Sequence, residues 1–287
     1  MTNSKVMLQE IKQRLHAEED EGEKDAMAWM LLEHASGLTA TQLRLNEAIQ
    51  HLNVDWLTQA IDRVNRHEPV QYVLGKAEFL GRSFEVNPSV LIPRPETEEL
   101  VVWLGQYLAA TFQPGNNIRI LDIGTGSGCI AISLALLQKH AEVYATDVSE
   151  EALHTATING HRLMAAVHWM KHDILEEDIA LSGLHLVVSN PPYIHPNEKT
   201  AMASNVLHHE PQQALFAPPE DVLIFYRAIA AKAKRALLAG GMLAVEINAL
   251  YAREVEEIFL RENYQHIRTL KDLSGKDRFV VANNFLP

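Results

Sequence analysis

The stretch that decides the fold is Ile120-Leu121-Asp122-Ile123-Gly124-Thr125-Gly126-Ser127-Gly128-Cys129. Its apolar first half predicts a buried strand, and the glycines predict a tight turn into a helix. Because glycine adopts positive φ without strain and lets a ligand approach the backbone, this turn is suited to a nucleotide-like cofactor. We expect the cofactor to be bound by Gly124, Thr125, Gly126, Ser127 and Gly128.

An acidic residue ends the next apolar run. Asp147 lies roughly 20 residues after Gly124, the spacing at which a carboxylate meets ribose hydroxyls in nucleotide-binding βαβ units. Capping of the following helix is the alternative role of Asp147. A dinucleotide fingerprint requires glycine where Cys129 stands, which disfavours NAD and fits an adenosine without a pyrophosphate.

From Gly115 onward, short apolar runs alternate with helical segments, as a parallel sheet covered by helices requires. This pattern predicts an α/β fold. Expected strands span 118–123, 142–147, 167–170, 184–189, 242–247 and 278–282. Expected helices span 129–139, 150–162, 221–238 and 252–261.

Two further cofactor contacts are expected after the third strand. The carboxyl ends of parallel strands line the ligand crevice, and Asp173 and Ile174 follow such an end. We expect both residues at the rim of the adenine. An ordinary turn aspartate is the alternative for Asp173.

The fourth expected strand runs directly into Asn190-Pro191-Pro192-Tyr193. The prolines fix φ and remove two N–H donors. A planar NH2 group could donate to the Asn190 side-chain oxygen and to the Pro191 carbonyl, while Tyr193 stacks on its flat face. Two fixed acceptors favour the pyramidal nitrogen that forms as it attacks a sulfonium methyl. The predicted catalytic and substrate-binding residues are therefore Asn190, Pro191, Pro192 and Tyr193, with Asn190 also at the cofactor.

The amino-terminal part has a different character. Apolar residues at helical spacing predict a helical bundle over 1–70, with a helix stop at Gly37 and a break at Pro69. Aromatic and β-branched residues punctuated by glycine predict a linking β-hairpin over 71–91. The cofactor-binding domain then spans 92–287, opening with a stiff loop and an acidic helix start at 92–99.

Composition narrows the possible functions. The 287 residues carry a formal charge of −12 without a basic run, which disfavours nonspecific nucleic-acid binding. One cysteine excludes an internal disulfide, and no apolar run reaches membrane-spanning length, so a cytoplasmic monomer is expected.

The cluster His208-His209-Glu210 contains possible metal ligands but lacks the HExxH spacing, and we expect no metal site. Cys129 is expected to pack rather than react.

The glycine turn, Asp147, the Asn190-Pro191-Pro192-Tyr193 segment and several further segments resemble the HemK/PrmC family. Its members are the protein-(glutamine-N5) methyltransferases of class 1 peptide chain release factors. The Pro93-Arg94-Pro95 loop discriminates this family best. Two departures are Ile174, where relatives can carry an adenine-lining tryptophan, and 216–221, where the family usually has a glycine-rich stretch. The resemblance covers 71–75, 79–84, 91–98, 124–128, Asp147, 190–193, Glu210-Pro211 and 275–278.

The resemblance implies a class I methyltransferase fold with a Rossmann-like, mostly parallel seven-stranded sheet. It implies S-adenosyl-L-methionine as cofactor, S-adenosyl-L-homocysteine as product, and the glutamine of a release factor's Gly-Gly-Gln loop as acceptor. The helical domain would help to dock the release factor. Glutamine methylation of a ribosomal protein, adenine-N6 methylation of nucleic acid and a noncatalytic module that binds translation factors remain alternatives.

Overall fold

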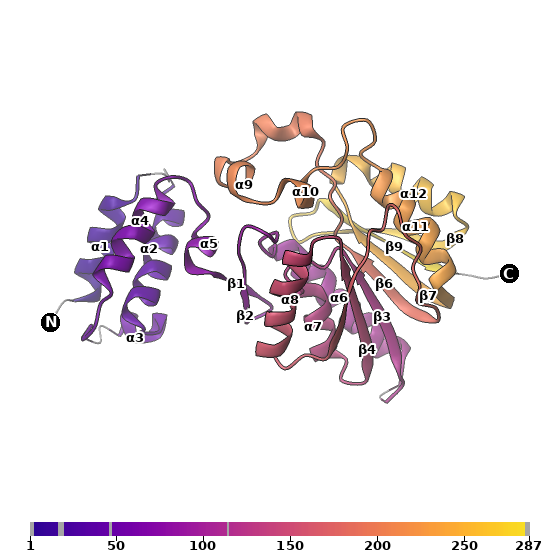
Figure 1. Cartoon of the computed structure of the whole chain (residues 1–287), viewed down its shortest axis with the longest axis horizontal. Coiled ribbons are helices and arrows are strands. Elements are labelled where there is room, and N and C mark those ends of the chain that lie inside the picture. Colours follow the sequence, from indigo (N-terminus) through magenta and orange to yellow (C-terminus); the bar gives the residue numbers. More distant parts are fainter. Residues whose placement is uncertain (1–2, 17–19, 46–47, 114, 285–287) are drawn as a thin grey trace. The chain divides into compact units, whose positions relative to one another are not determined.

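The computed structural model describes residues 3–16, 20–45, 48–113 and 115–284. The chain folds into two compact units. One consists of the chain up to Lys76 together with Ala203–His209, and the other of Ala77–Met202 together with the chain from Glu210 onward. Each unit has a hydrophobic core of its own (Figure 1).

The first unit is a bundle of helices. Its helices are α1 (Ser4–Arg14), α2 (Glu21–Ser36), α3 (Ala40–Arg44), α4 (Val54–Val64) and α5 (Val70–Leu74), and α9 (Ser204–His209) belongs to the same unit but has no buried residue. Apolar side chains at helical spacing, among them Ile11, Leu31 and Ile61, form the buried core. Asp20 caps the start of α2, and Gly37 ends it with φ 70°, which confirms the predicted helix stop.

The linking segment differs in part from the hairpin expected over 71–91. Helix α5 lies between its two cap residues, Pro69 and Gly75, and the buried Tyr72 and Val73 belong to this helical turn rather than to a strand. Two short strands follow, β1 (Lys76–Phe79) and β2 (Arg82–Glu85), and pair as a separate two-stranded sheet. The hairpin itself is therefore confined to residues 76–85.

The second unit is built on a seven-stranded sheet in the order β5-β4-β3-β6-β7-β9-β8. Its strands are β3 (Ile118–Ile123), β4 (Ala141–Asp147), β5 (Val167–Lys171), β6 (Leu184–Ser189), β7 (Leu237–Glu246), β8 (Tyr264–Lys271) and β9 (Asp277–Asn284). The first five strands in this order are parallel, and β9 is antiparallel to both of its neighbours. The expected mostly parallel sheet is confirmed, although β8 was not among the predicted strands.

Helices cover both faces of this sheet (Figure 1). Alternate strand residues such as Ile120 and Leu186 pack on one face against α6 and α7, whereas Leu121 and Val187 pack on the other against α11 and α12. The helices of this unit are α6 (Pro95–Thr111), α7 (Cys129–Leu137), α8 (Glu150–Arg162), α10 (Gln212–Leu215), α11 (Ile224–Ala236) and α12 (Ala252–Arg261). Two 3-10 helices are η1 (Pro196–Ala201) and η2 (Ala249–Tyr251).

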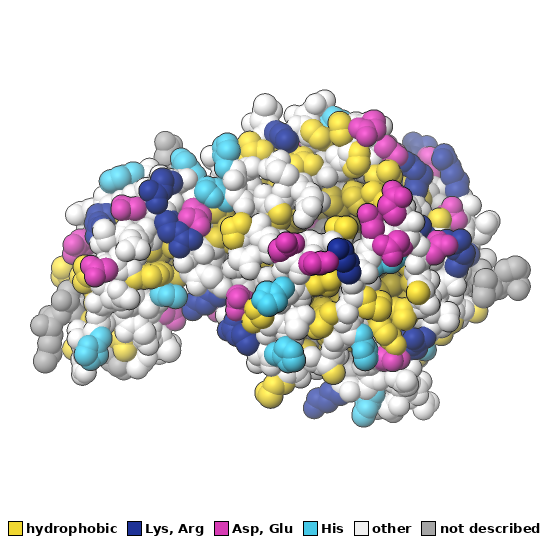
Figure 2. Space-filling view, in the orientation of Figure 1, with side chains coloured by type: hydrophobic (Ala, Val, Ile, Leu, Met, Phe, Trp, Pro, Cys, Tyr) yellow, Lys and Arg dark blue, Asp and Glu magenta, His cyan; other side chains and the backbone are white. Residues whose placement is uncertain are grey.

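The surface carries charges of both signs. On the face shown in Figure 2, Lys and Arg side chains lie among Asp and Glu side chains rather than in one basic patch. Within the described residues, no helix is both long enough and apolar enough to cross a membrane.

Candidate active site

A cleft of about 1050 Å³, its open mouth included, lies in the second unit at the carboxyl ends of the parallel strands. This is the edge of an open α/β sheet at which ligands bind. Its wall comes from the turns after β3, β4, β5 and β6, and from the loop before α6. The predicted site residues that line it are Gly124, Thr125, Gly126, Ser127, Asp147, Asp173, Ile174, Asn190, Pro191 and Pro192.

The glycine turn adopts a backbone that other residues would strain. Gly124 and Gly126 have φ values of 71° and 54°, and a Cβ at either position would meet no protein atom within 4 Å. Both line the cleft, so their backbone is open to a ligand. The N–H groups of Gly124 and Thr125 donate to the Thr146 carbonyl at 2.8 and 2.9 Å, which anchors the turn to β4.

Gly128 has a different role from the other glycines of the turn. It is not one of the residues that line the cleft. Its φ is 81°, and a Cβ there would lie 3.0 to 3.2 Å from side-chain atoms of Ile132, Trp169 and Ala156. Close packing of α7 against its neighbours therefore requires glycine at this position.

Asp147 closes the turn from the neighbouring strand. Its Oδ2 accepts from the Gly126 N–H at 2.8 Å and its Oδ1 from the Ser149 N–H at 3.0 Å. Burial raises the pKa of this carboxyl above its usual range. The side chain of Ser149, rather than that of Asp147, caps α8. Each carboxylate oxygen retains a lone pair for a further donor, such as a hydroxyl.

Asp122 supports the turn from below, although sequence reasoning assigned it no role. Its Oδ2 accepts from the Thr125 hydroxyl at 2.7 Å and from the Ala131 N–H at 3.2 Å. Its Oδ1 is buried without a hydrogen-bond partner in the described part of the chain. Burial raises the pKa of Asp122 from 3.8 to about 7. The position of Asp122 two residues before the first glycine, Gly124, was the available signal.

Asp173 and Ile174 lie where the sequence predicted, at the cleft after β5. Ile174 is buried and also belongs to the core under α11. Asp173 Oδ1 accepts from the Leu175 N–H at 2.9 Å, so this residue is a turn aspartate as well as a wall of the cleft.

The corner Asn190-Pro191-Pro192 follows β6 directly and lines the same cleft. The Ser189 hydroxyl donates to the Ile123 carbonyl at 2.7 Å, which ties the end of β6 to the end of β3. Asn190 Nδ2 donates to Thr97 Oγ1 at 3.3 Å. The glycine turn, Asp147 and the corner are thus brought together around one cavity.

Tyr193 lies elsewhere than expected. It is not among the residues that line the cleft, and its ring packs on the core beneath the corner. Its hydroxyl donates to Glu246 Oε1 at 3.2 Å, and burial raises its pKa. The predicted stacking of Tyr193 on a substrate stays a prediction, and the location of the ring outside the cleft lining does not support it.

The loop before α6 contributes residues that sequence reasoning had not given a role. Arg94 lines the cleft, and its Nη2 lies 2.7 Å from Oε1 of the buried Glu210. Glu210 Oε2 also accepts from the Ile92 N–H at 3.2 Å. The carboxylate of the His208-His209-Glu210 cluster is therefore engaged by Arg94, and no group of three or more metal-ligating side chains occurs in the described residues.

Cys129 lines the cleft at the start of α7. Burial raises the pKa of its thiol to about 12. Because the thiolate is the nucleophilic form, Cys129 is a packing residue at neutral pH.

Comparisons with known proteins identify both parts of the chain. Residues 7–75 match the model of the PrmC N-terminal domain, and residues 105–220 match that of the methyltransferase small domain. The release factor glutamine methyltransferase of Bacteroides thetaiotaomicron is 46% identical over 79% of this chain and 80% of its own length. That of Flavobacterium psychrophilum is 38% identical over 92% of this chain and 93% of its own length.

A solved structure supports the fold alone. A methyltransferase from Pyrococcus furiosus superimposes with a TM-score of 0.52 at 18% sequence identity. The match covers 80% of this chain and 100% of that chain.

Proposed function

Because this chain belongs to the family of release factor glutamine methyltransferases, we propose that it methylates the side-chain amide nitrogen (N5) of a release-factor glutamine. The methyl donor is S-adenosyl-L-methionine, and the product is S-adenosyl-L-homocysteine. The observation that carries the proposal is one cleft lined by the glycine turn, by Asp147 and by the Asn190-Pro191-Pro192 corner.

The cleft fits the cofactor chemically. Gly124 and Gly126 leave room for close approach to the backbone, and Asp147 offers carboxylate oxygens to ribose hydroxyls. Asp173 and the aliphatic Ile174 offer a rim for the adenine. When bound, S-adenosyl-L-methionine supplies an electrophilic methyl group on a positively charged sulfur.

The corner suits an amide nitrogen. Asn190 Oδ1 and the Pro191 carbonyl are two acceptors for the two hydrogens of the glutamine NH2. An amide nitrogen is a poor nucleophile because its lone pair is delocalised, so acceptors that favour the pyramidal, partly positive nitrogen stabilise the transition state. The proton can leave after transfer, when the nitrogen is acidic, and no strong base is required.

The acceptor is proposed to be a class 1 peptide chain release factor, at the glutamine of its Gly-Gly-Gln loop. The relatives are named release factor glutamine methyltransferases, and residues 7–75 match the model of the PrmC N-terminal domain. We propose that this helical unit helps to recognise the release factor. The net charge of −12 disfavours a nucleic-acid acceptor.

A methylation assay with separate acceptors tests this proposal. The purified chain and methyl-labelled cofactor are incubated separately with a release factor, with ribosomal proteins, and with DNA or RNA. We expect label only in the release factor, and none when its Gly-Gly-Gln glutamine is replaced by alanine. Label in ribosomal protein or nucleic acid, with the release factor unlabelled, would refute the proposed acceptor.

A further inference from the structure

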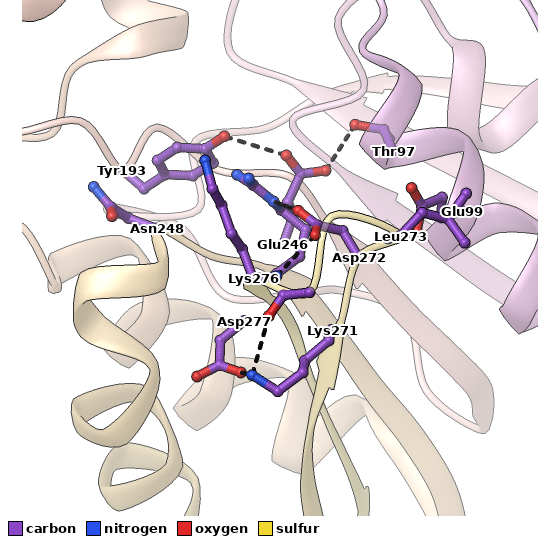
Figure 3. A network of polar contacts seen from close by, with 12 residues as sticks. Thr97, Glu99, Tyr193, Glu246, Asn248, Lys271, Asp272, Leu273, Lys276 and Asp277 are labelled. Carbon is purple, nitrogen blue, oxygen red and sulfur yellow. Dashed lines mark hydrogen bonds and ion pairs between the residues drawn. The ribbon is translucent and has the colours of Figure 1, made fainter.

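A buried carboxylate lies behind the catalytic corner. Glu246 is the last residue of β7 and is only 1% exposed. Its Oε2 accepts from the Thr97 hydroxyl at 2.7 Å and its Oε1 from the Tyr193 hydroxyl at 3.2 Å (Figure 3). One carboxylate thus connects α6, β7 and the loop after β6.

The hydrogen bonds determine which way the Asn190 amide points. Thr97 has a single hydroxyl proton and donates it to Glu246. The Thr97 oxygen can then only accept, and it accepts from Asn190 Nδ2 at 3.3 Å. With its nitrogen committed to Thr97, Asn190 presents its Oδ1 to other partners. Thr97 and Asn190 both line the cleft.

We propose that Glu246 is a positioning residue that acts through Thr97 to hold Asn190 with its amide oxygen available to the substrate NH2. The proposal rests on the proposed function of the corner. Through Tyr193, the same carboxylate also fixes the other end of the tetrapeptide. Glu246 is not among the residues that line the cleft, so it would act on the substrate only through its neighbours.

The hydrogen bonds from Asn190 to Thr97 and from Thr97 to Glu246 form a relay. This relay depends on the ionisation of Glu246. A neutral Glu246 could donate its proton to Thr97, and Thr97 could then donate to Asn190 Oδ1. The Asn190 amide would have to rotate and would present N–H groups to the N–H groups of the substrate. The positioning role therefore requires the carboxylate form.

Opposing influences act on this carboxylate. Burial raises its pKa, whereas the Thr97 hydrogen bond and the positive charge of Arg278 lower it. Arg278 is itself held by Asp272, whose Oδ2 lies 3.1 Å from Arg278 Nε. The titratable groups that interact with Glu246 are Arg278, Tyr193, Glu96, Tyr226 and Cys129.

Nuclear magnetic resonance of the side-chain NH2 of Asn190 tests the relay without any substrate. The resonance is assigned by its loss in Asn190→Ala. In the native chain we expect it to shift as falling pH protonates Glu246. In Glu246→Gln and in Thr97→Val this shift should be absent. Thr97→Ser, which keeps the hydroxyl, should retain it.

Glu99→Gln is the matched control, because Glu99 lies on the same helix and accepts instead from the Leu273 N–H at 3.0 Å (Figure 3). Its spectrum should titrate as the native one does. Thermal melting establishes that each variant is folded. Two results would overturn the relay whether or not release factors are the acceptor. One is an Asn190 chemical shift that does not change with pH in the native chain, and the other is a shift that still changes with pH in Thr97→Val.

Turnover provides a second readout. We expect Thr97→Val to lower kcat by about tenfold or more through misplacement of Asn190, with the Kd for the cofactor within about twofold of native. Thr97→Ser should restore kcat to within about threefold. An unchanged kcat in folded Thr97→Val would contradict a positioning role even if the chain methylates release factors.

Discussion

Asn190 is one of the two proposed acceptors for the glutamine NH2. Its replacement leaves the glycine turn and Asp147 unchanged. We expect Asn190→Ala to lower the rate of methyl transfer by about 100-fold or more, since a fixed polar partner of the transition state is lost. Cofactor affinity should change little. Single-turnover kinetics and calorimetry measure the two quantities, and normal turnover would refute the proposed chemistry.

Asp147 should behave in the opposite way. Its carboxylate holds the Gly126 and Ser149 N–H groups and is proposed to bind the ribose. We expect Asp147→Ala to weaken cofactor binding first and to lose part of its activity only because less cofactor is bound. Calorimetry and a rate measured at saturating cofactor separate the two effects. A native affinity for the cofactor in this variant would contradict the proposed contact between Asp147 and the ribose.

The raised pKa of Asp122 makes stability depend on pH. Its folded pKa of about 7 exceeds its ordinary value of 3.8. The associated stability is fully present below the ordinary value and is lost as pH rises toward about 7. We expect Asp122→Asn, which does not titrate, to gain stability relative to the native chain between about pH 4 and 7. Chemical denaturation across this range tests it, and a pH-independent difference would contradict it.

Sequence reasoning foresaw which segments line the cleft where neighbours along the chain share one motif, whereas the roles assigned to these residues stay predictions. The glycine turn, Asp147 and the corner are contiguous motifs or follow strands, so their placement around one cleft was foreseeable. Thr97 and Glu246 are separated by 149 residues. Residue type alone reveals neither burial nor a distant hydrogen-bond partner, and the relay could not have been found in this way.

Within the turn element, two glycines are required for different reasons. Gly128→Ala places a Cβ about 3 Å from three side chains at positive φ, and we expect a loss of about 1–3 kcal/mol in stability. Gly124→Ala meets no protein atom within 4 Å, so it should cost about 1–2 kcal/mol from φ alone but weaken cofactor binding more. Denaturation and calorimetry of the pair test this contrast. Equal effects of both variants on cofactor affinity would contradict it.

Strand β8 and helix α5 are among the elements that sequence prediction missed, and the reasons are physical. Strand β8 lies at the sheet edge, and along it Tyr264 is buried while most other residues are polar or partly exposed, so it shows little of the apolar signal of a central strand. Helix α5 contains Tyr72 and Val73, which favour strands by type, but tertiary burial decides their conformation. The central strands were predictable because both of their faces are buried.

At the scale of the whole molecule, the cleft belongs to the second unit alone. We expect added S-adenosyl-L-methionine to slow hydrogen exchange in the turns after β3, β4, β5 and β6, since binding stabilises the form that binds. The helices of the first unit should exchange as before. Mass spectrometry of exchanged peptides locates the protection, and protection confined to the helical unit would contradict this assignment.

The most direct measurement is a solved complex of the native chain with S-adenosyl-L-homocysteine and a glutamine-containing release-factor peptide. The account predicts that the glutamine nitrogen lies within hydrogen-bond distance of Asn190 Oδ1 and of the Pro191 carbonyl, with the cofactor sulfur on its open side. A glutamine bound away from this corner, or a cofactor outside the glycine turn, would contradict it.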